Sequence, residues 1–324
     1  MNLRVGLLGT GGIGARHADA MEKVAGLELV ACCGRDPGKV RDFALARGAV
    51  DYTDFAAMLA SERLDLLVVA LPPFAHDGQV ELAARNGVHL LVEKPIALTQ
   101  AQADAMVAAS RDVVAACGFM YRFGAAVERW DALRVAGATG RIAHFSGSFH
   151  CNALHAPWWR DQSRSGGQMV EQLIHIVDLA RDNLGMPRSV FATATRFGHA
   201  DLPDYTAEDV SAIVLTYDSG AVGVLHASNM AVPGQWTKQW QIVGERMTGR
   251  FTDCNCGELI DTVGGDAVAV FQTGPDPFVA QLADLANAIT RGRPVRVPIA
   301  DGAESLQIVL AARRSAKERR EIVL

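Results

Sequence analysis

The chain has 324 residues, a length that predicts two domains. Hydrophobic residues make up 49% and charged residues 21%, which excludes a disordered or fibrous chain. Asp and Glu number 36 against 31 Lys and Arg, so the net charge of −5 argues against nucleic acid as a partner. The longest strongly apolar run, Leu66–Leu71, is far shorter than the roughly 20 residues of a membrane helix, and six cysteines are too few for a disulfide scaffold. We therefore expect a cytoplasmic protein with reduced thiols and no membrane partner.

The first part of the chain alternates short apolar runs with turn signals and amphipathic stretches, which is the pattern of βα units. Each run is apolar almost throughout, as strands covered on both faces must be. This predicts an α/β dinucleotide-binding Rossmann domain over residues 1–119, with a doubly wound parallel sheet. The predicted strands are Leu3–Leu8, Leu27–Cys33, Leu66–Leu71, Val88–Val92 and Val113–Cys117.

After Gly118 the pattern changes to helices followed by strands of alternating polarity. The turn Asp218-Ser219-Gly220 lies between two alternating runs, which indicates a hairpin. We therefore expect an α+β substrate-binding and oligomerisation domain over residues 120–324, with an open-faced antiparallel sheet; the last helix, 301–317, is a candidate to pack back on the first domain. The predicted helices are Ala125–Val135, Gln168–Leu184, Pro277–Arg291 and Asp301–Lys317, and the predicted strands are Ile142–Phe149, Val190–Phe197, Val210–Tyr217, Ala221–Ala227, Gln239–Val243, Gly249–Thr252 and Ala267–Gln272.

A glycine-rich turn follows the first strand and opens the first helix. Gly9-Thr10-Gly11-Gly12-Ile13-Gly14 matches the G-x-G-x-x-G fingerprint, in which the glycines permit a tight turn, close approach of a pyrophosphate and close helix packing. Amide N–H groups at the start of the helix would bind the phosphates. The pattern favours a dinucleotide site, and the alternative is a structural turn in another doubly wound domain.

The end of the second strand indicates which dinucleotide is bound. The fingerprint expects a carboxylate here for the ribose 2′-hydroxyl, but the sequence is Cys33-Gly34-Arg35-Asp36. A small residue followed by Arg35 suits a 2′-phosphate, so NADP is favoured modestly over NAD. We interpret Asp36 as the N-cap of the next helix; a carboxylate turned inward would favour NAD instead.

Two further groups carry chemistry. Glu93-Lys94-Pro95 follows the predicted strand Val88–Val92, at the sheet edge where ligands of open α/β folds bind, although any single lysine there could be a surface residue. On the helix Gln168–Leu184, at about 100° per residue, Glu171 and His175 share one polar face that could equally be a solvated stripe. The preceding pair, Gly166-Gly167, would let the backbone approach another molecule closely.

These residues together resemble the glucose-fructose oxidoreductase and inositol dehydrogenase (Gfo/Idh/MocA) family. The resemblance runs the length of the chain and is carried by the Gly9–Gly14 turn, Leu71-Pro72-Pro73 with His76, Glu93-Lys94-Pro95, Gly118-Phe119-Met120-Tyr121-Arg122-Phe123, Trp159-Arg160, Gly166-Gly167 with Glu171, His175 and Asp178, and Asp301 to Ser305. Three positions depart from the family pattern. Glu171 stands where many relatives have Asp, and Leu173 stands where many have a glycine. Gln168 replaces the third glycine of a triplet, where its side chain could line the pocket.

The resemblance implies a Rossmann domain, an open-faced C-terminal sheet and a nicotinamide between them, and a homodimer or homotetramer through that sheet. It implies that Lys94 binds the reacting hydroxyl and His175 is the general base, assisted by Glu171. The cofactor-binding residues would be Gly9, Thr10, Gly11, Gly12, Ile13, Gly14, Arg35, Leu71, Pro72, His76, Glu93 and Lys94. The substrate-binding residues would be Tyr121, Arg122, Trp159, Arg160, Glu171 and His175, and His150, His155 and Trp158 are further candidates to line that pocket.

The residue types fit the oxidation of a secondary alcohol. A histidine with a pKa near neutrality can accept the hydroxyl proton while hydride leaves carbon, and a lysine can stabilise the developing alkoxide. No metal is expected, because the histidines lack a ligand spacing with carboxylates. The prediction is an NAD(P)-dependent oxidoreductase acting on a sugar, sugar derivative or cyclitol. The alternatives are a redox-neutral hydrolase or epimerase with a retained cofactor, and a non-enzymatic regulator.

Overall fold

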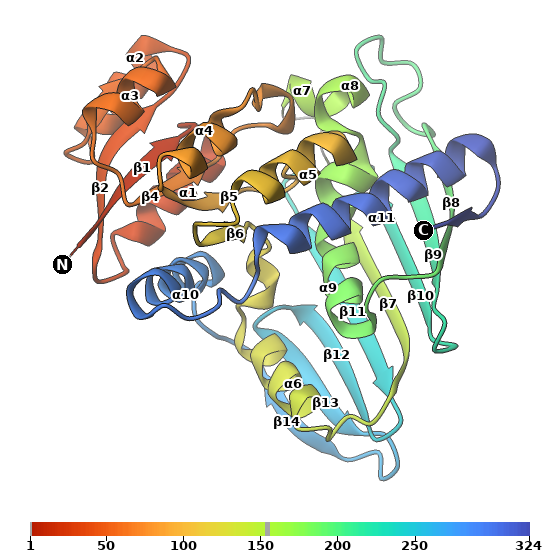
Figure 1. Cartoon of the computed structure of the whole chain (residues 1–324). Helices are drawn as coiled ribbons and strands as arrows, with labels where there is room; N and C mark the ends of the chain where they lie inside the picture. The colour runs from red at the N-terminus through yellow and green to blue at the C-terminus, as the bar shows by residue number, and fades with distance from the viewer. Residues whose placement is uncertain (1, 153–155) are drawn as a thin grey trace. The chain divides into compact units, whose positions relative to one another are not determined.

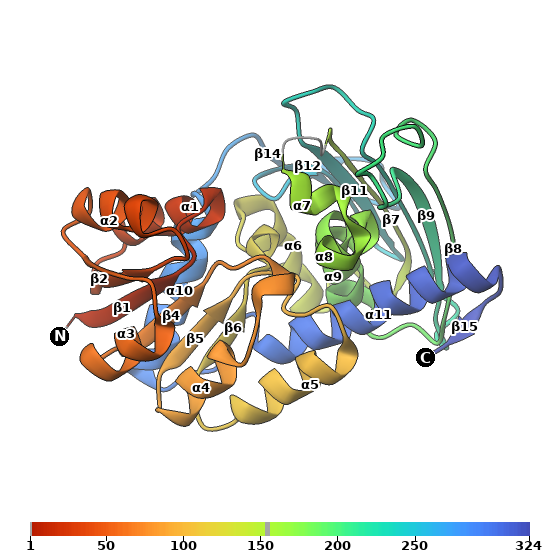
Figure 2. The ribbon, with the colours of Figure 1, turned by 90° about the horizontal axis from the view of Figure 1, so that it is seen from above.

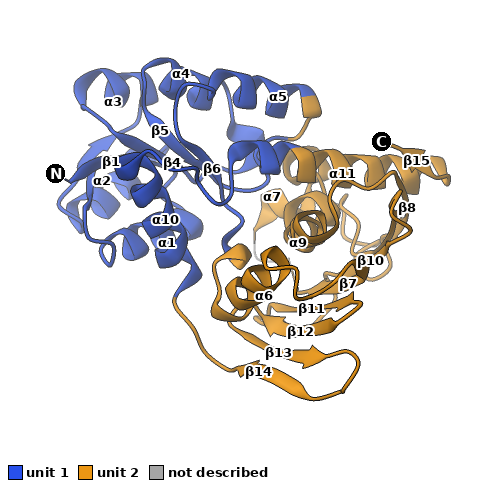
Figure 3. Cartoon of the chain, turned by 60° about the horizontal axis from the view of Figure 1, so that its bottom comes forward, with its two compact units in different colours: residues 1–97, 101–120, 276–303 blue, residues 98–100, 121–275, 304–324 orange. Residues whose placement is uncertain are grey.

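The computed structural model describes residues 2–152 and 156–324, which form two compact units (Figure 3). The first unit comprises residues 1–97, 101–120 and 276–303, and the second comprises residues 98–100, 121–275 and 304–324. Residues 276–303 thus group with the N-terminal part of the chain. The domain division predicted from the sequence, at residues 119 and 120, stays a prediction, as does the packing of helix 301–317 on the first domain.

The first unit is built on a six-stranded parallel sheet with the order β3-β2-β1-β4-β5-β6. Strand order reverses between β1 and β4, which is the switch point where ligands of open α/β sheets bind. Every residue of β4 is buried, as expected of a strand covered on both faces. The strands are β1 (Leu3–Leu8), β2 (Leu27–Cys33), β3 (Val50–Tyr52), β4 (Leu66–Val69), β5 (His89–Val92) and β6 (Ala115–Cys117).

Helices cover both faces of this sheet. A core of buried side chains joins one face to α1 (Gly12–Met21), α2 (Pro37–Leu45) and α10 (Pro277–Arg291). Figure 3 shows α3 (Phe55–Ser61), α4 (Gln79–Arg85) and α5 (Gln100–Ala109) on the opposite face. The predicted doubly wound Rossmann fold is confirmed, and its short edge strand β3 is an element that the sequence pattern did not indicate.

The second unit contains a nine-stranded sheet with the order β14-β13-β12-β11-β7-β10-β9-β8-β15. Strands β7 and β10 pair in parallel, and the other pairs are antiparallel. The predicted antiparallel sheet is therefore corrected to a mixed one, because β7 enters between β11 and β10 rather than joining either by a hairpin. The strands are β7 (Ile142–His150), β8 (Ser189–Thr195), β9 (Val210–Thr216), β10 (Val222–Ser228), β11 (Thr237–Gly244), β12 (Met247–Asp253), β13 (Cys256–Asp261), β14 (Ala267–Phe271) and β15 (Ile322–Val323).

Helices lie on one face of the nine-stranded sheet and leave the other open (Figures 1 and 2). Burial along β9 follows this division, since Ser211, Ile213 and Leu215 are buried while Val210, Ala212 and Val214 are exposed. The predicted hairpin at Asp218-Ser219-Gly220 is confirmed by the antiparallel pairing of β9 with β10. The helices of this unit are α6 (Ala125–Val135), α7 (Pro157–Arg160), α8 (Gln162–Ser165), a π-helical turn at Met169–Leu173, α9 (Ile174–Leu184) and the part of α11 (Ile299–Glu318) from residue 304.

The predicted long helix at Gln168–Leu184 divides into two parts. Its first turn, Met169–Leu173, is π-helical, and the regular α-helix begins at Ile174. Strand β13 is also new: it begins at Cys256, between the predicted strands Gly249–Thr252 and Ala267–Gln272. Within residues 2–152 and 156–324, no helix combines the length and apolar character needed to cross a membrane. The predicted cytoplasmic location stays a prediction.

Candidate functional site

The glycine-rich turn lies at the carboxyl edge of the first sheet, at the switch point between β1 and β4. Gly9 has φ of 102°, and a Cβ atom there would lie 2.6 Å from the carbonyl oxygen of Ala70. A Cβ atom on Gly14 would lie 2.0 Å from the carbonyl oxygen of Gly9. Both glycines are therefore required by the protein's own backbone.

Gly11 and Gly12 differ from these, since no atom lies within 4 Å of a Cβ placed on either. Both are exposed, and no side chain caps the N-terminus of α1. Free backbone N–H groups at the first turn of a helix bind anions, and the missing side chains let a phosphate approach. This cradle fits the pyrophosphate of a dinucleotide.

The segment after β2 contains the residues expected to distinguish the cofactors. Arg35 is exposed, and a Cβ atom on Gly34 would lie 3.0 Å from Oγ1 of Thr10, so this segment borders the turn. Asp36 is the N-cap of α2, and its Oδ1 accepts hydrogen bonds from the backbone N–H of Gly38 and Lys39, both at 3.1 Å. The predicted N-cap role of Asp36 is confirmed.

The next two strands end beside the turn. Leu8, Val69 and Val92 are aligned across β1, β4 and β5, so Leu71 and Lys94 follow at the same sheet edge. Leu71, Pro72 and Lys94 are half-buried, and the Lys94–Pro95 peptide bond is cis. His76 is buried, and burial lowers its pKa to about 4, so its imidazole is neutral near neutral pH.

Glu93 is buried and makes two short contacts through its carboxylate. Its Oε1 lies 2.7 Å from Nε2 of His17, on helix α1, and its Oε2 accepts a hydrogen bond of 3.1 Å from the backbone N–H of Lys94. Sequence reasoning did not single out His17. Its position eight residues after Gly9 has no signal in the fingerprint, and only the packing of α1 on the sheet brings it to Glu93.

The second unit buries the polar face of its long helix. Glu171 has 6% of its surface exposed, His175 5% and Asp178 1%. The alternative of a solvated stripe is therefore excluded for these three residues. Glu171 lies in the π-helical turn and His175 in the first turn of α9; π-helical turns are rare and often mark functional sites.

Two aromatic rings enclose His175. The Tyr121 ring centroid lies 4.8 Å from that of the imidazole at an interplanar angle of 51°, and the Phe149 ring stacks on it at 6.2 Å and 12°. Burial raises the pKa of Tyr121 to about 12, so its hydroxyl remains protonated. The structure thus brings the predicted residues Tyr121 and His175 together.

Lys238 of β11 is a further residue of this cluster; from the sequence it was expected only as the last residue of a loop, 230–238, that influences specificity. Its Nζ lies 5.0 Å from the Tyr121 ring centroid and 2.7 Å from Oδ2 of Asp253. Burial disfavours the charge on Lys238, but Tyr121 and Asp253 outweigh this effect and raise its pKa. Lys238 therefore stays charged beside the Tyr121 ring.

Arg122 is buried beneath the same helix. Its Nε and Nη2 donate to the two carboxylate oxygens of Asp178 at 2.7 and 2.6 Å, and its Nη1 donates to Asp182 at 2.9 Å. Burial raises the pKa of Asp178, and Arg122 beside it opposes that rise. These ion pairs fix α9 to the segment that carries Tyr121. The predicted contact of Arg122 with substrate stays a prediction, which this pairing does not favour.

Trp159 and Arg160 lie in the short helix α7. The Trp159 ring contacts Trp236 edge-on at 5.4 Å, and Nη1 of Arg160 lies 2.9 Å from Oδ2 of Asp204. His155, a candidate to line the substrate pocket, lies outside the described residues.

Residues near the start of the long helix are packed against the protein itself. Gly166 and Gly167 have φ of 83° and 91°, and Cβ atoms there would meet Val170 and Glu208. They are thus required by internal packing, and the approach of another molecule is not needed to explain them. Gln168 is 2% exposed and hydrogen-bonds Ser211 rather than opening into a pocket. In the described part of the chain, no three His, Cys, Asp or Glu side chains are grouped as a metal site.

Comparison with known proteins identifies the family. Residues 3–119 match the model of an oxidoreductase family with an NAD-binding Rossmann fold, and residues 128–250 match the GFO/IDH/MocA C-terminal domain. The chain belongs to the GFO/IDH/MocA oxidoreductase family. The predicted family, fold and enzyme class are thereby confirmed.

Members of the GFO/IDH/MocA family with curated names include sugar dehydrogenases. The chain is 34% identical to D-apiose dehydrogenase of Paraburkholderia graminis over 68% of its own length and 59% of that protein's length. It is 31% identical to D-xylose 1-dehydrogenase (NADP(+)) 2 of Haloferax volcanii over 69% of its own length and 68% of that protein's. The solved structure of levoglucosan dehydrogenase in complex with NADH and levoglucosan superposes with a TM-score of 0.91 at 22% identity, covering 100% of this chain and 99% of the other.

Proposed function

We propose that this GFO/IDH/MocA protein is an NAD(P)-dependent dehydrogenase or reductase that transfers hydride between a nicotinamide and a secondary hydroxyl or ketone of a sugar, sugar derivative or cyclitol. The observation that carries the proposal is that the same chain has an open phosphate cradle in its first unit and, in its second, a buried His175 enclosed by aromatic rings. The sugar dehydrogenases among the relatives support this substrate class.

In this proposal three side chains act on the reacting alcohol. His175 accepts the hydroxyl proton, Lys94 binds the hydroxyl oxygen and stabilises the alkoxide, and Glu171 assists His175. The bound nicotinamide supplies the hydride acceptor. Burial of His175 and Glu171 excludes water from the proton acceptor, which strengthens each electrostatic contact there.

We propose that Gly9, Thr10, Gly11, Gly12, Ile13 and Gly14 hold the pyrophosphate, with Leu71, Pro72, His76, Glu93 and Lys94 along the same sheet edge.

NADP remains modestly favoured over NAD because Arg35 is exposed beside the turn, and because both N–H partners of Asp36 hold its Oδ1 as a helix cap. Replacing Arg35 with Ala should therefore raise KM for NADP more than KM for NAD; equal changes for both cofactors would contradict this role.

Tyr121, Trp159 and Arg160 remain proposed substrate contacts, together with His175 and Glu171. Tyr121 is supported by its packing against the His175 ring. Aromatic faces suit the C–H surfaces of sugars, which supports Trp159. For Arg122 we propose that the guanidinium holds α9 in place, because three of its N–H groups already contact carboxylates.

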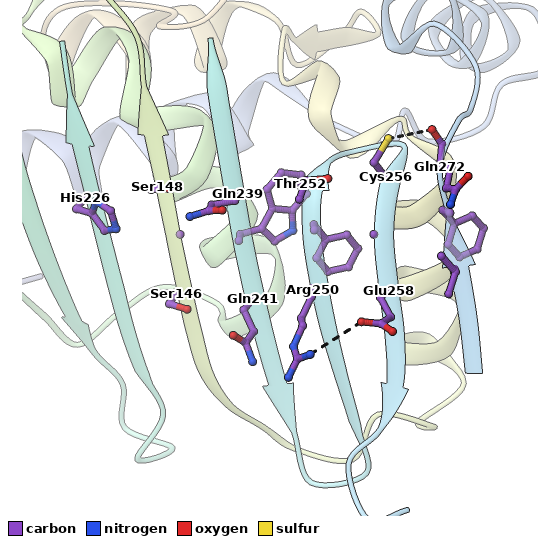
Figure 4. Close-up of a pocket in the computed structure, with 16 residues that line it drawn as sticks. Ser146, Ser148, His226, Gln239, Gln241, Arg250, Thr252, Cys256, Glu258 and Gln272 are labelled. Carbon is purple, nitrogen blue, oxygen red and sulfur yellow. Dashed lines mark hydrogen bonds and ion pairs between the residues drawn. The ribbon is translucent and has the colours of Figure 1, made fainter. Parts of the chain in front are cut away.

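We also propose that a second copy of the chain packs on the open face of the nine-stranded sheet. Exposed Phe191, Val214 and Val224 give this face an apolar part. A hollow of about 770 Å³ adjoins it; its lining includes the apolar side chains of Val270 and Phe271 as well as the Arg250–Glu258 ion pair (Figure 4). Leaving such apolar surface in water is unfavourable. Light scattering should give a dimer or tetramer, and a Val224→Asp variant should dissociate it; a monomeric wild-type protein would contradict the proposal.

The experiment that tests the proposed function is a screen of aldoses, sugar acids and cyclitols with NAD and NADP, followed by nicotinamide absorbance. We expect reduced cofactor to accumulate with at least one substrate, and Lys94→Ala and His175→Ala each to abolish turnover while cofactor binding persists. Product without accumulated reduced cofactor would instead indicate a hydride-borrowing hydrolase or epimerase. Unchanged turnover in both variants would remove the proposed mechanism.

A further inference from the structure

Helix α1 and the segment that carries Lys94 are joined by a buried polar contact. His17, fully buried on α1, places its Nε2 2.7 Å from Oε1 of Glu93. The other ring nitrogen, Nδ1, has no hydrogen-bond partner among the described residues, so the ring hydrogen lies on Nε2 and is donated to the carboxylate. The imidazole and the Phe278 ring pack in a T-shaped arrangement, with ring centroids 5.1 Å apart and an interplanar angle of 74°, which restrains the imidazole plane.

Both oxygens of Glu93 are engaged by donors. Oε1 receives the His17 N–H, and Oε2 receives the backbone N–H of Lys94. Gly118 leaves the room that this carboxylate fills, since a Cβ atom there would lie 2.7 Å from both Cδ and Oε2 of Glu93. The carboxylate is thus in contact with protein atoms on three sides. The next residue in the chain is Lys94, the proposed catalytic lysine.

We propose that His17 is a positioning residue for Lys94, acting through the carboxylate of Glu93. The inference rests on the proposed function, because it needs Lys94 to bind the reacting oxygen. It assigns Glu93 the task of fixing the Lys94 backbone. A buried carboxylate that joins two donors from different elements restrains both of them.

The position of His17 gives this contact a second consequence. Helix α1 starts at the phosphate cradle, and His17 lies on its second turn. The cradle and Lys94 are therefore connected through one helix and one carboxylate, all within the first unit. A catalytic group displaced by about 1 Å can lose roughly 100-fold in rate, so this connection is sufficient to govern turnover.

The test uses variants that disturb the contact from two sides. His17→Leu removes the donor, and His17→Gln keeps an N–H donor at a similar reach. Gly118→Ala displaces the carboxylate without removing any polar group. The matched control is His89→Leu, which removes a histidine hydrogen bond of 2.9 Å to the backbone N–H of Val114 at the opposite end of β5.

We expect His17→Leu and Gly118→Ala to lower kcat by about 10- to 100-fold on the substrate selected by the screen, with the Kd for NADPH changed less than about 2-fold. His17→Gln should recover most of the activity, and His89→Leu should retain wild-type kcat even where its thermal stability falls. Circular dichroism shows whether His17→Leu folds. If it does not fold, the kcat of Gly118→Ala tests the inference.

A second readout needs neither substrate nor cofactor. Amine labelling followed by peptide mass spectrometry should modify Lys94 several-fold faster in His17→Leu than in the wild type, and equally fast in His89→Leu. Lys39, whose side chain is 83% exposed, is the internal reference. Wild-type kcat and labelling in the folded His17→Leu and Gly118→Ala variants would overturn the inference, whereas an active Lys94→Ala variant would overturn the proposed function itself.

Discussion

The glycine turn of the first unit and the long helix of the second build their parts of the site by opposite means. The turn works through backbone: Gly9 and Gly14 let the chain fold tightly, and Gly11 and Gly12 leave space for a ligand. The helix works through side chains, since Glu171, His175 and Asp178 are polar and yet almost fully buried. A site formed by backbone N–H groups needs residues without side chains, such as glycine. A site formed by buried polar side chains needs hydrogen-bond partners from elsewhere in the fold.

This difference decides how each part responds to change. Polar side chains inside a protein must be paired, so the helix depends on neighbours such as Arg122 and Tyr121. The turn depends chiefly on the absence of Cβ atoms. Substitutions at the helix should therefore destabilise the protein by removing hydrogen bonds or ion pairs. Substitutions at the turn should act through steric overlap of the added Cβ atom.

The largest expected effect is the loss of the buried ion pair under α9. Arg122→Leu leaves the carboxylate of Asp178 buried without its bidentate partner, which should lower the free energy of unfolding by about 3–5 kcal/mol. Replacing both residues, Arg122→Leu with Asp178→Leu, should recover much of this loss. The measurement is urea unfolding at pH 7.

The control for this prediction is an exposed ion pair in the same unit. Arg141 and Glu245 form one, and the Arg141 side chain is 88% exposed, so Arg141→Ala should lower the free energy of unfolding far less than Arg122→Leu does. Equal losses for Arg122→Leu and Arg141→Ala would show that the second unit does not rely on buried pairing.

The next effect separates the glycines within the turn. Gly14→Ala places a Cβ atom 2.0 Å from a backbone oxygen, so we expect unfolding to become easier by about 3 kcal/mol, at the upper end of the overpacking range. Gly11→Ala meets no protein atom and should keep wild-type stability while weakening NADPH binding. Calorimetric melting and fluorescence titration measure the two quantities. A Gly11→Ala variant that binds NADPH normally would show that the cradle does not hold the cofactor.

The same contrast explains what the sequence could predict. The bounds of β1 and β2 agree with the predicted strands, because a buried parallel strand is a continuous apolar run. The fingerprint likewise marks Gly9 to Gly14, since steric requirements on glycine are local. The sheet of the second unit is mostly antiparallel, as predicted, but its one parallel pair was not anticipated, because the pairing of β7 with β10 joins segments nearly 80 residues apart, as in Phe145 with Gly223.

Contacts of the site were less predictable because they depend on packing between distant segments. The polar residues of the long helix were found by spacing, but their burial was not, since it depends on Arg122 and Phe149. The π-helical turn has no composition signal. His17 also escaped prediction: one buried histidine on an amphipathic helix is ordinary until Glu93 is seen beside it.

The smallest of these effects tests whether the first unit also depends on a buried side chain. His76 follows β4, at the sheet edge that carries the glycine-rich turn. Burial lowers its pKa to about 4 from an ordinary value of 6.5. The folded state thus disfavours protonation, so the stability that neutral His76 contributes is complete above pH 6.5 and declines as the pH falls from 6.5 toward 4.

At pH 5 this linkage should cost about 2 kcal/mol relative to pH 7, because the unfolded histidine takes up a proton that the folded one refuses. His76→Gln removes the titrating group, so its free energy of unfolding should change less between pH 7 and pH 5 than that of the wild type, by about that amount. Urea titrations of both proteins at the two pH values give the difference. Parallel pH profiles for wild type and variant would show that burial does not keep His76 neutral in the folded state.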